Sequence, residues 1–450
     1  MTVVNILGLI LALAVLIILV FKKIPIIFAV IAATLVAGLT NVTGVWEALN
    51  NLAKGTGDTF ASFLFVFLLS TIYGELMAAL GLANSIANFL VKIFGKKNVA
   101  IVIILTTGLL VFGGVTAMVV CFTIVPIGIS LLRQANISKK FLPGLISLGQ
   151  ATFALTALPA SPQLNNIIPT AYLGTTSTAA PLLGCIAAVI MFGLGTLYFY
   201  LVIKKSQKKG EAFDENTVPL NYRNEAAEEK TSNVILAFLP MVLLIACYLV
   251  FENVNFWGYK FKEHGAYSAI STAMVISVIY LIILGVALKK WKLTLNTLKK
   301  GGVDWISPLL NFSMIVGFGY VIQNTDGFAK LVEFACNIPG PKYISAAISV
   351  CLLAGVTGSA SGGLKIALGS DELVASWLAG GTSPQALHRI ISVASGGLDS
   401  LPHCGGILAT LDVCGESHSN SYIHIFVTTV IIPIIATFVI VMLACLGVVI

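Results

Sequence analysis

Two titratable residues, Asp399 and His403, lie four positions apart around Pro402 in a stretch that is otherwise apolar. A proline removes a backbone donor and clashes with the preceding turn, and the glycine pairs at 396–397 and 405–406 loosen the chain on both sides. A continuous helix cannot pass through this segment. Inside a membrane such a break is tolerated where its backbone lines a cavity or is buried in protein, so polar groups there indicate a binding site.

The carboxylate of Asp399 is the group in this segment best suited to carrying a proton. A carboxylate in a membrane-spanning segment is costly unless it is protonated, paired with a cation or hydrated. We therefore predict that Asp399 carries a coupling proton, with His403 as a second participant. The alternatives are an ion pair between Asp399 and Lys365 or Arg389, and a neutral His403 that only caps the break.

The composition defines the surroundings of these groups. The chain has 450 residues, 58% hydrophobic and 10% charged, with a mean hydropathy of +0.98, whereas soluble domains carry about 25% charged residues. Most apolar segments have the ~17 to 25 residues that span a ~30 Å hydrocarbon core as a helix. We predict an all-α polytopic protein of the cell membrane. The net charge of +7 does not indicate nucleic-acid binding, because the basic residues lie in short loops between apolar segments.

Several other chemistries are disfavoured by the residue patterns. The eight cysteines are scattered over apolar segments, so we expect small buried residues and no disulfides. No cofactor and no metal are expected, and no phosphate-binding Walker loop is present in the sequence. A zinc-dependent membrane enzyme is a remote alternative, because its ligands would straddle a helix break; they would be His403, Cys404, Cys414 and His418.

Short internal matches indicate that the chain is a duplication. Three matches recur in order with offsets between 241 and 245: Gly-Val-Thr at 114–116 and 355–357, Ile-Ser at 146–147 and 391–392, and Leu-Pro at 158–159 and 401–402. We predict an N-terminal repeat over 1–203 with a re-entrant hairpin at 98–132 and a broken helix at 139–174. A linker at 204–232 leads to a C-terminal repeat over 233–450, with a hairpin at 343–380 and a broken helix at 384–418.

The basic residues predict how the repeats are oriented. With both termini outside and both hairpins re-entrant, cytoplasmic loops hold 19 of the 26 Lys and Arg residues and outer loops hold five. The two repeats then enter the membrane from opposite sides, which makes them an inverted repeat. The candidate substrate-binding residues at the hairpin tips and helix breaks are Gly114, Thr116, Ser161, Gln163, Asn165, Asn166, Thr357, Gly358, Ser359, Ser361, Lys365, Arg389, Ser400 and His403.

Each of these groups also has a structural alternative. The hydroxyl residues at the tips could simply allow close helix packing. The amides of Gln163, Asn165 and Asn166 could cap the half-helix that follows the first break. Lys365 and Arg389 could extend to the membrane interface instead of attracting an anion.

Three motifs resemble the gluconate:proton symporter family of the wider ion transporter superfamily: Thr156-Ala-Leu-Pro-Ala-Ser-Pro-Gln163, Thr357-Gly-Ser-Ala-Ser-Gly-Gly-Leu-Lys365 and Gly397-Leu-Asp-Ser-Leu-Pro-His403. The last motif is most similar to the hydroxybutyrate permease branch. The gluconate branch has a first break rich in His and Pro, which this sequence replaces with Leu158-Pro-Ala-Ser-Pro162.

The resemblance covers nearly the whole chain and implies a function. It implies two inverted repeats, a scaffold with a moving transport domain, a homodimer, and import of a small carboxylate together with a cation. We expect a transporter rather than an enzyme, working by proton symport on hydroxybutyrate, gluconate or a related hydroxy acid. A sodium-coupled carboxylate or citrate symporter is the alternative.

Overall fold

The computed structural model describes residues 2–450 except 23, 42–43, 96–97, 116, 220–232, 255–266, 326, 329, 331–337, 380 and 403. All regular secondary structure in these residues is helical, which confirms the predicted all-α class. Six helical stretches in the described part are long and apolar enough to cross a membrane. An apolar helix satisfies its own backbone groups, which is what a lipid environment requires.

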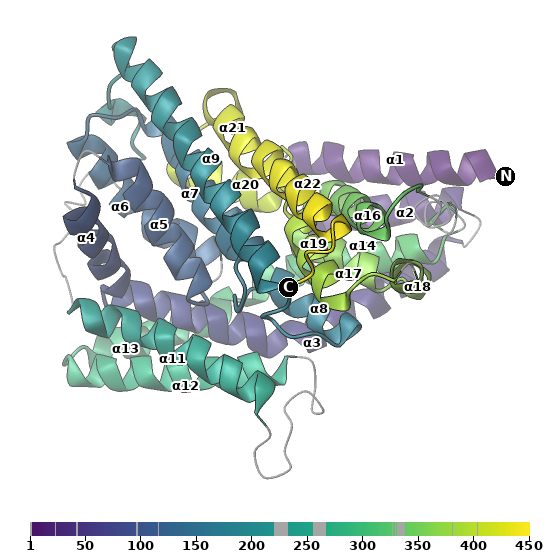
Figure 1. Ribbon diagram of the computed structural model, residues 1–450, viewed down its shortest axis with the longest axis horizontal. Coiled ribbons are helices and arrows are strands. Elements are labelled where there is room, and N and C mark those ends of the chain that lie inside the picture. Colours follow the sequence, from purple (N-terminus) through teal and green to yellow (C-terminus); the bar gives the residue numbers. More distant parts are fainter. Residues whose placement is uncertain are drawn as a thin grey trace.

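Eight of the described helices form a first group around the long helix α3. They are α1 (Thr2–Phe21), α2 (Ile26–Thr40), α3 (Val45–Ala79), α4 (Leu82–Phe94), α11 (Val234–Asn253), α12 (Ser268–Ala287), α13 (Trp291–Asp304) and α14 (Ile306–Gln323). Helix α3 contacts α2, α12, α13 and α14. In Figure 1, α3, α11, α12 and α13 run nearly parallel along the lower edge of the molecule.

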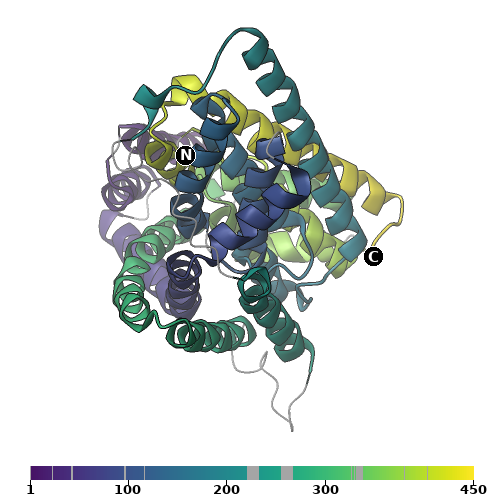
Figure 2. The same ribbon diagram turned by 90° about the vertical axis from the view of Figure 1, so that its left-hand side faces the viewer.

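The following described α-helices form a second group. They are α5 (Val99–Phe112), α6 (Ala117–Gln134), α7 (Leu142–Ala151), α8 (Leu164–Leu173), α9 (Pro181–Lys208), α16 (Lys342–Thr357), α17 (Ala360–Leu368), α18 (Asp371–Ala379), α19 (Pro384–Ser395), α20 (Gly405–Cys414), α21 (His418–Phe426) and α22 (Ile432–Cys445). Helices α9 and α22 lie side by side in both views (Figures 1 and 2).

Two helices of the second group are interrupted where the prolines predict a break. Helix α7 is followed by a π-helical turn at Phe153–Ala157, and the chain is then extended at Leu158 and Gln163 before α8 begins. The second interruption separates the end of α19 from the start of α20. We call the segments 158–163 and 396–404 the first and second breaks. Pro159, Pro162 and Pro402 lie inside them; a proline removes a backbone donor and clashes with the preceding turn, which favours a break.

Each half of the chain also forms a helical hairpin that reverses at a glycine. Gly114 has a φ of 95° between α5 and α6, and Gly358 has a φ of 59° between α16 and α17. These left-handed conformations are accessible to glycine without a steric penalty. The glycine-rich segments that the sequence analysis selected are therefore the hairpin tips.

The packing of the hairpins and broken helices follows the same pattern in both halves. Within its own half, α5 contacts α7, and α16 contacts α19. Across the halves, α6 contacts α20, and α17 contacts α8. This reciprocal pattern is what a duplicated chain with two-fold pseudo-symmetry produces. The orientation of the repeats in a membrane remains a prediction.

The boundaries of the elements differ from the predicted ones by a few residues. Helix α9 continues to Lys208 and so extends into the predicted linker, and α6 continues to Gln134. The segment 209–219 is described, whereas the rest of the predicted linker lies outside the described residues. Both helices carry, in their last turn, basic residues whose long side chains reach water while their apolar stems stay on the protein, so each helix extends beyond its apolar segment.

Candidate functional site

The first break is organised by the guanidinium of Arg389, a fully buried residue of α19. It donates to the carbonyl oxygens of Ala157 (3.2 Å), Ser177 (3.1 Å) and Ala179 (2.9 and 3.1 Å), and to Oδ1 of Asn166 (2.9 Å). The Ala157 carbonyl lies where the helix is interrupted, and those of Ser177 and Ala179 lie in the loop 174–180 between α8 and α9, so all three lack the partners that a continuous helix would supply. Arg389 neither extends to the membrane interface nor offers a free donor to an anion in this conformation.

Asn166 and His388 complete this network. The Asn166 amide donates to the carbonyls of Ser161 (2.9 Å) and Ser177 (2.8 Å). Its Oδ1 accepts from Nε2 of His388 (3.2 Å), while Nδ1 of His388 pairs with the hydroxyl of Thr175 (2.7 Å). An amide oxygen can only accept, so Nε2 carries hydrogen. The side chain of Asn166 is thus used within the protein, but it does not cap α8, which was the structural alternative predicted for it.

Gln163 fastens the first break to the first hairpin tip. Its amide donates to the carbonyls of Val111 (2.5 Å) and Val115 (3.3 Å). A Cβ added to Gly114 would lie 2.8 Å from a methyl group of Leu244, so the tip packs closely against α11. Ser161 donates to the carbonyl of Ala154 (2.8 Å). Both predicted contact residues of this break are therefore engaged with backbone carbonyls.

The second hairpin tip is largely closed by its own hydroxyl groups. Thr357 donates to the carbonyl of Leu353 (2.8 Å), and the Ser359 hydroxyl accepts from the amide of Gly362 (3.1 Å). Ser359 is thereby the N-cap of α17. Ser361 lies in the first turn of α17 and is half-buried.

Lys365 points from α17 toward the first helix group. Its Nζ donates to the Thr59 hydroxyl of α3 (3.2 Å) and lies 4.6 Å from the ring centre of Phe63. Because Arg389 is also engaged elsewhere, an ion pair of either cation with Asp399 does not occur among the described residues. That alternative from the sequence is wrong for this conformation.

Asp399 is a buried carboxylate in the second break. It is 6% exposed, and its Oδ1 accepts from the hydroxyl of Ser400 (2.9 Å). Two residues of α21 hold the backbone of this break: the Tyr422 hydroxyl donates to the carbonyl of Ser400 (3.1 Å), and Nε2 of His418 donates to that of Pro402 (3.1 Å). The sequence analysis considered His418 only as a zinc ligand and did not single out Tyr422.

The two breaks lie next to each other. The amide of Asn165, at the start of α8, donates to the hydroxyl of Ser395 at the end of α19 (2.7 Å). A Cβ added to Gly396 would lie 3.1 Å from the methyl group of Thr156. The structure therefore brings both breaks together, each beside its own hairpin. Thr116 and His403 lie outside the described residues.

Two buried charged residues were missed as site residues by the sequence analysis. Lys139, 1% exposed, donates to the carbonyls of Cys414 (2.5 Å) and Gly415 (3.1 Å) and pairs with Glu416 (3.0 Å), so it caps α20. Glu252, at the end of α11, accepts from the amide and hydroxyl of Ser177. The sequence does contain a signal for Glu252, because an acidic residue at the end of an apolar segment is unusual.

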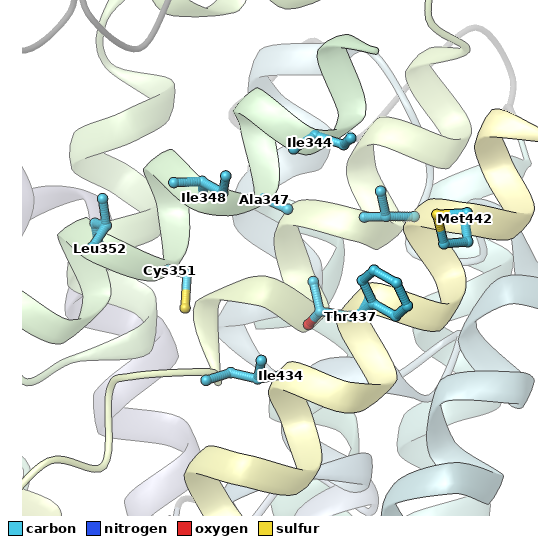
Figure 3. A pocket seen from close by; sticks show the side chains of 10 residues that line it. Ile344, Ala347, Ile348, Cys351, Leu352, Ile434, Thr437 and Met442 are labelled. Carbon is cyan, nitrogen blue, oxygen red and sulfur yellow. The ribbon is translucent and has the colours of Figure 1, made fainter. Parts of the chain in front are cut away.

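An apolar groove of about 320 Å³ lies between α16 and α22. Figure 3 shows side chains of both helices facing it, among them Ile348, Cys351 and Ile434. The hydroxyl of Thr437 already donates to the carbonyl of Pro433 (2.8 Å). The groove offers no charged donor to an anion, so it is not a carboxylate site.

The chain is similar to known permeases. A sequence profile of GntP family permeases matches residues 4–325. An uncharacterized transporter of Bacillus subtilis, YxjC, is 35% identical over 431 residues, covering 90% of this chain and 91% of that protein. A gluconate permease of the same organism is 23% identical over 365 residues, covering 77% of each chain.

A solved structure supports the fold. The crystal structure of the YdaH transporter from Alcanivorax borkumensis superposes with a TM-score of 0.50 at 13% identity, covering 89% of this chain and 90% of that one. At this identity the likeness concerns the fold alone. The sequence profile and the 35% identical relative cover most of the chain, and its apolar helices fit a multi-pass membrane protein. The chain therefore belongs to the GntP family of permeases.

Proposed function

We propose that this permease is a secondary active transporter that imports a small carboxylate together with a proton. The substrate class is hydroxybutyrate, gluconate or a related hydroxy acid. The observation that carries the proposal is the buried carboxylate of Asp399, whose neighbour in the described structure is the neutral hydroxyl of Ser400. A carboxylate without a cation is tolerated in a membrane protein when it is protonated, and it can release the proton when a conformational change hydrates it.

The N-terminus of α20 is the position that we propose for the substrate carboxylate. A helix N-terminus offers unpaired amides and roughly half a positive charge. The N-cap residue of α20 is Cys404, whose thiol lies against the amides of Gly406 and Ile407 without a side-chain cap hydrogen bond, whereas the Ser359 hydroxyl caps α17. Gly406 in the first turn of α20 is exposed, and a Cβ added to it would meet no atom closer than 3.8 Å. An anion can therefore approach these amides.

If the substrate carboxylate binds close to Asp399, its binding is coupled to the binding of the proton. A second negative charge nearby disfavours the ionised form of a carboxylate. A substrate anion would bind best when Asp399 carries its proton, and loss of either ligand would weaken the other. This reciprocity is the thermodynamic requirement for symport.

We further propose that the second helix group moves against the first, as in an elevator. A separate observation agrees with the predicted orientation of the chain. Three ion pairs between different elements each join residues near the predicted cytoplasmic side: Lys300 with Glu75, Lys140 with Glu211, and Lys139 with Glu416. Homodimerisation is a prediction from the family resemblance.

Uptake by proteoliposomes tests the proposal. Labelled hydroxybutyrate, gluconate and citrate are offered under an imposed pH gradient or an imposed sodium gradient. We expect accumulation of a hydroxy acid when the outside is acidic. Accumulation driven only by sodium would establish the alternative coupling, and absence of uptake of any carboxylate would contradict the proposal.

The Gly406→Leu variant tests the position of the anion. The added side chain enters open space, so it should leave the fold intact while covering the amides of α20. We expect uptake to be abolished. The matched control is Gly193→Leu in α9, where a Cβ meets no atom within 4 Å. Equal uptake by both variants would move the substrate site away from α20.

A further inference from the structure

Glu252 makes a contact between the two helix groups that none of the roles above explains. It belongs to α11 of the first group and is 8% exposed. Its carboxylate accepts from the Ser177 amide (2.9 Å), the Ser177 hydroxyl (2.6 Å) and the Tyr248 hydroxyl (3.1 Å). Two of these donors bond to Oε1 and one to Oε2, so three donors converge on one buried carboxyl group. Among the described residues, no Lys or Arg pairs with Glu252.

Ser177 connects this carboxylate directly to the first break. Its carbonyl accepts from Arg389 (3.1 Å), from the amide of Asn166 (2.8 Å) and from the backbone amide of Ala160 (3.0 Å). One residue of the loop 174–180 therefore faces the network of the break with its carbonyl and the first helix group with its amide and hydroxyl.

Separating the two helix groups at Glu252 therefore costs free energy. Withdrawing Glu252 leaves the amide and hydroxyl of Ser177 without their partner and leaves a desolvated carboxylate behind. The contact therefore stabilises the observed arrangement of the loop 174–180 relative to α11. A state in which the groups have moved must replace it by water or by other partners.

We propose that Glu252 is the docking residue by which α11 holds the loop 174–180 and the first break, and that this contact opens once in each transport cycle. The second clause rests on the proposed movement of one helix group against the other. Glu252 acts as a positioning residue. It contacts neither of the positions proposed for the proton and the substrate.

Hydrogen exchange of the purified full-length protein tests the contact independently of transport. Glu252→Gln preserves the shape but weakens the acceptor, and Ser177→Ala removes one donor. Loss of one such bond should raise amide exchange in the loop 174–180 about tenfold. The matched control is Asn253→Ala, because the exposed Asn253 side chain donates only within α11, to the carbonyl of Leu249 (2.9 Å). This control should leave the exchange unchanged.

Carboxylate uptake by the same variants tests the role in the cycle. We expect the maximal uptake rate of Glu252→Gln and Ser177→Ala to change about fivefold or more, with a smaller change in KM, because the docked state and not the substrate contact is altered. Asn253→Ala should match the wild type. If Glu252→Gln does not fold, amide exchange and uptake are measured on Ser177→Ala and Tyr248→Phe instead.

The outcomes separate this inference from the proposed function. If the wild type takes up no carboxylate, the proposed function fails, and the exchange measurement still decides whether Glu252 holds the loop. Unchanged exchange in the variants would overturn the docking contact. Faster exchange with unchanged uptake in a transporting protein would overturn its opening during the cycle.

Discussion

The two helix breaks look alike in sequence but are built differently. The first is held by several side chains: Arg389 binds the carbonyl of Ala157 just before it, Asn166 binds that of Ser161, and Gln163 ties it to its hairpin tip. The second contains a buried carboxylate, Asp399, with a hydroxyl neighbour, and two residues of α21 hold only its backbone. The chain thus contains one anchored break and one break that retains a titratable group.

The difference shows how the two halves support each other. The cation that holds the first break, Arg389, comes from the broken helix of the second half, and Lys139 from the first half caps α20 in return. Both cations satisfy backbone carbonyls, which are left without partners wherever a helix is interrupted. A buried Arg or Lys in such a fold is therefore not by itself evidence of an anion site.

The largest expected effect comes from Arg389→Ala. Removing the guanidinium leaves buried carbonyls without donors, which should lower the free energy of unfolding by about 3 kcal/mol or more. Arg389→Lys should recover only part of this, because an ammonium group has three donors and lacks the planar fork. Thermal unfolding in detergent measures both variants.

A matched control for this variant is Arg133→Ala. Arg133 pairs with Glu215 at 2.5 Å on the surface, and such pairs contribute about 0 to 1 kcal/mol. If Arg389→Ala unfolded at the same temperature as Arg133→Ala, the description of the first break as an anchored region would be wrong.

A smaller loss is expected from Gln163→Ala. The carbonyls of Val111 and Val115 at the first tip would lose their side-chain donor, which should cost about 1 to 3 kcal/mol and speed amide exchange at the tip. The exposed Gln134, whose amide reaches only Ser130 at 3.5 Å, provides the control Gln134→Ala. Equal stability of the two variants would show that the tip does not depend on the first break.

The interruptions and the hairpin tips were predictable from sequence because their causes are local. Pro402 cannot continue a helix, and Gly358 adopts a left-handed turn that few residues tolerate. The partners of Arg389 were not predictable, since a buried arginine gives the same sequence signal whether it binds an anion or carbonyls from the other half of the chain. The same holds for Lys139, whose partners lie about 275 residues away.

The variant Ser359→Ala tests the role of Ser359 at the second hairpin tip. The variant removes the N-cap of α17, which should cost about 1 kcal/mol. Amide exchange at residues 360–363 should rise, while Ser361→Ala, inside the helix, should leave it unchanged. A loss of substrate affinity in Ser359→Ala without faster exchange would instead assign Ser359 to the substrate site.

The smallest effect concerns the segment 209–219, on the predicted cytoplasmic side. Hydrogen bonds from Lys140 and Ser206 hold the pKa of Glu211 below its usual range. A lowered pKa in the folded state means that this contact stabilises at neutral pH and is lost as the pH falls through that lowered value. Proteolysis of the segment should therefore accelerate in acid, and Glu211→Gln should remove the pH dependence. An unchanged pH profile in the variant would show that another group is responsible.

Uptake by the Asp399→Asn variant tests the central claim, that the second break carries the coupling proton. Asparagine mimics the protonated carboxyl group, so the variant should still exchange labelled substrate across the proteoliposome membrane at equilibrium. It should not accumulate substrate when the outside is made acidic. Retained accumulation of substrate against its gradient under external acid, at a level equal to the wild type, would contradict the account.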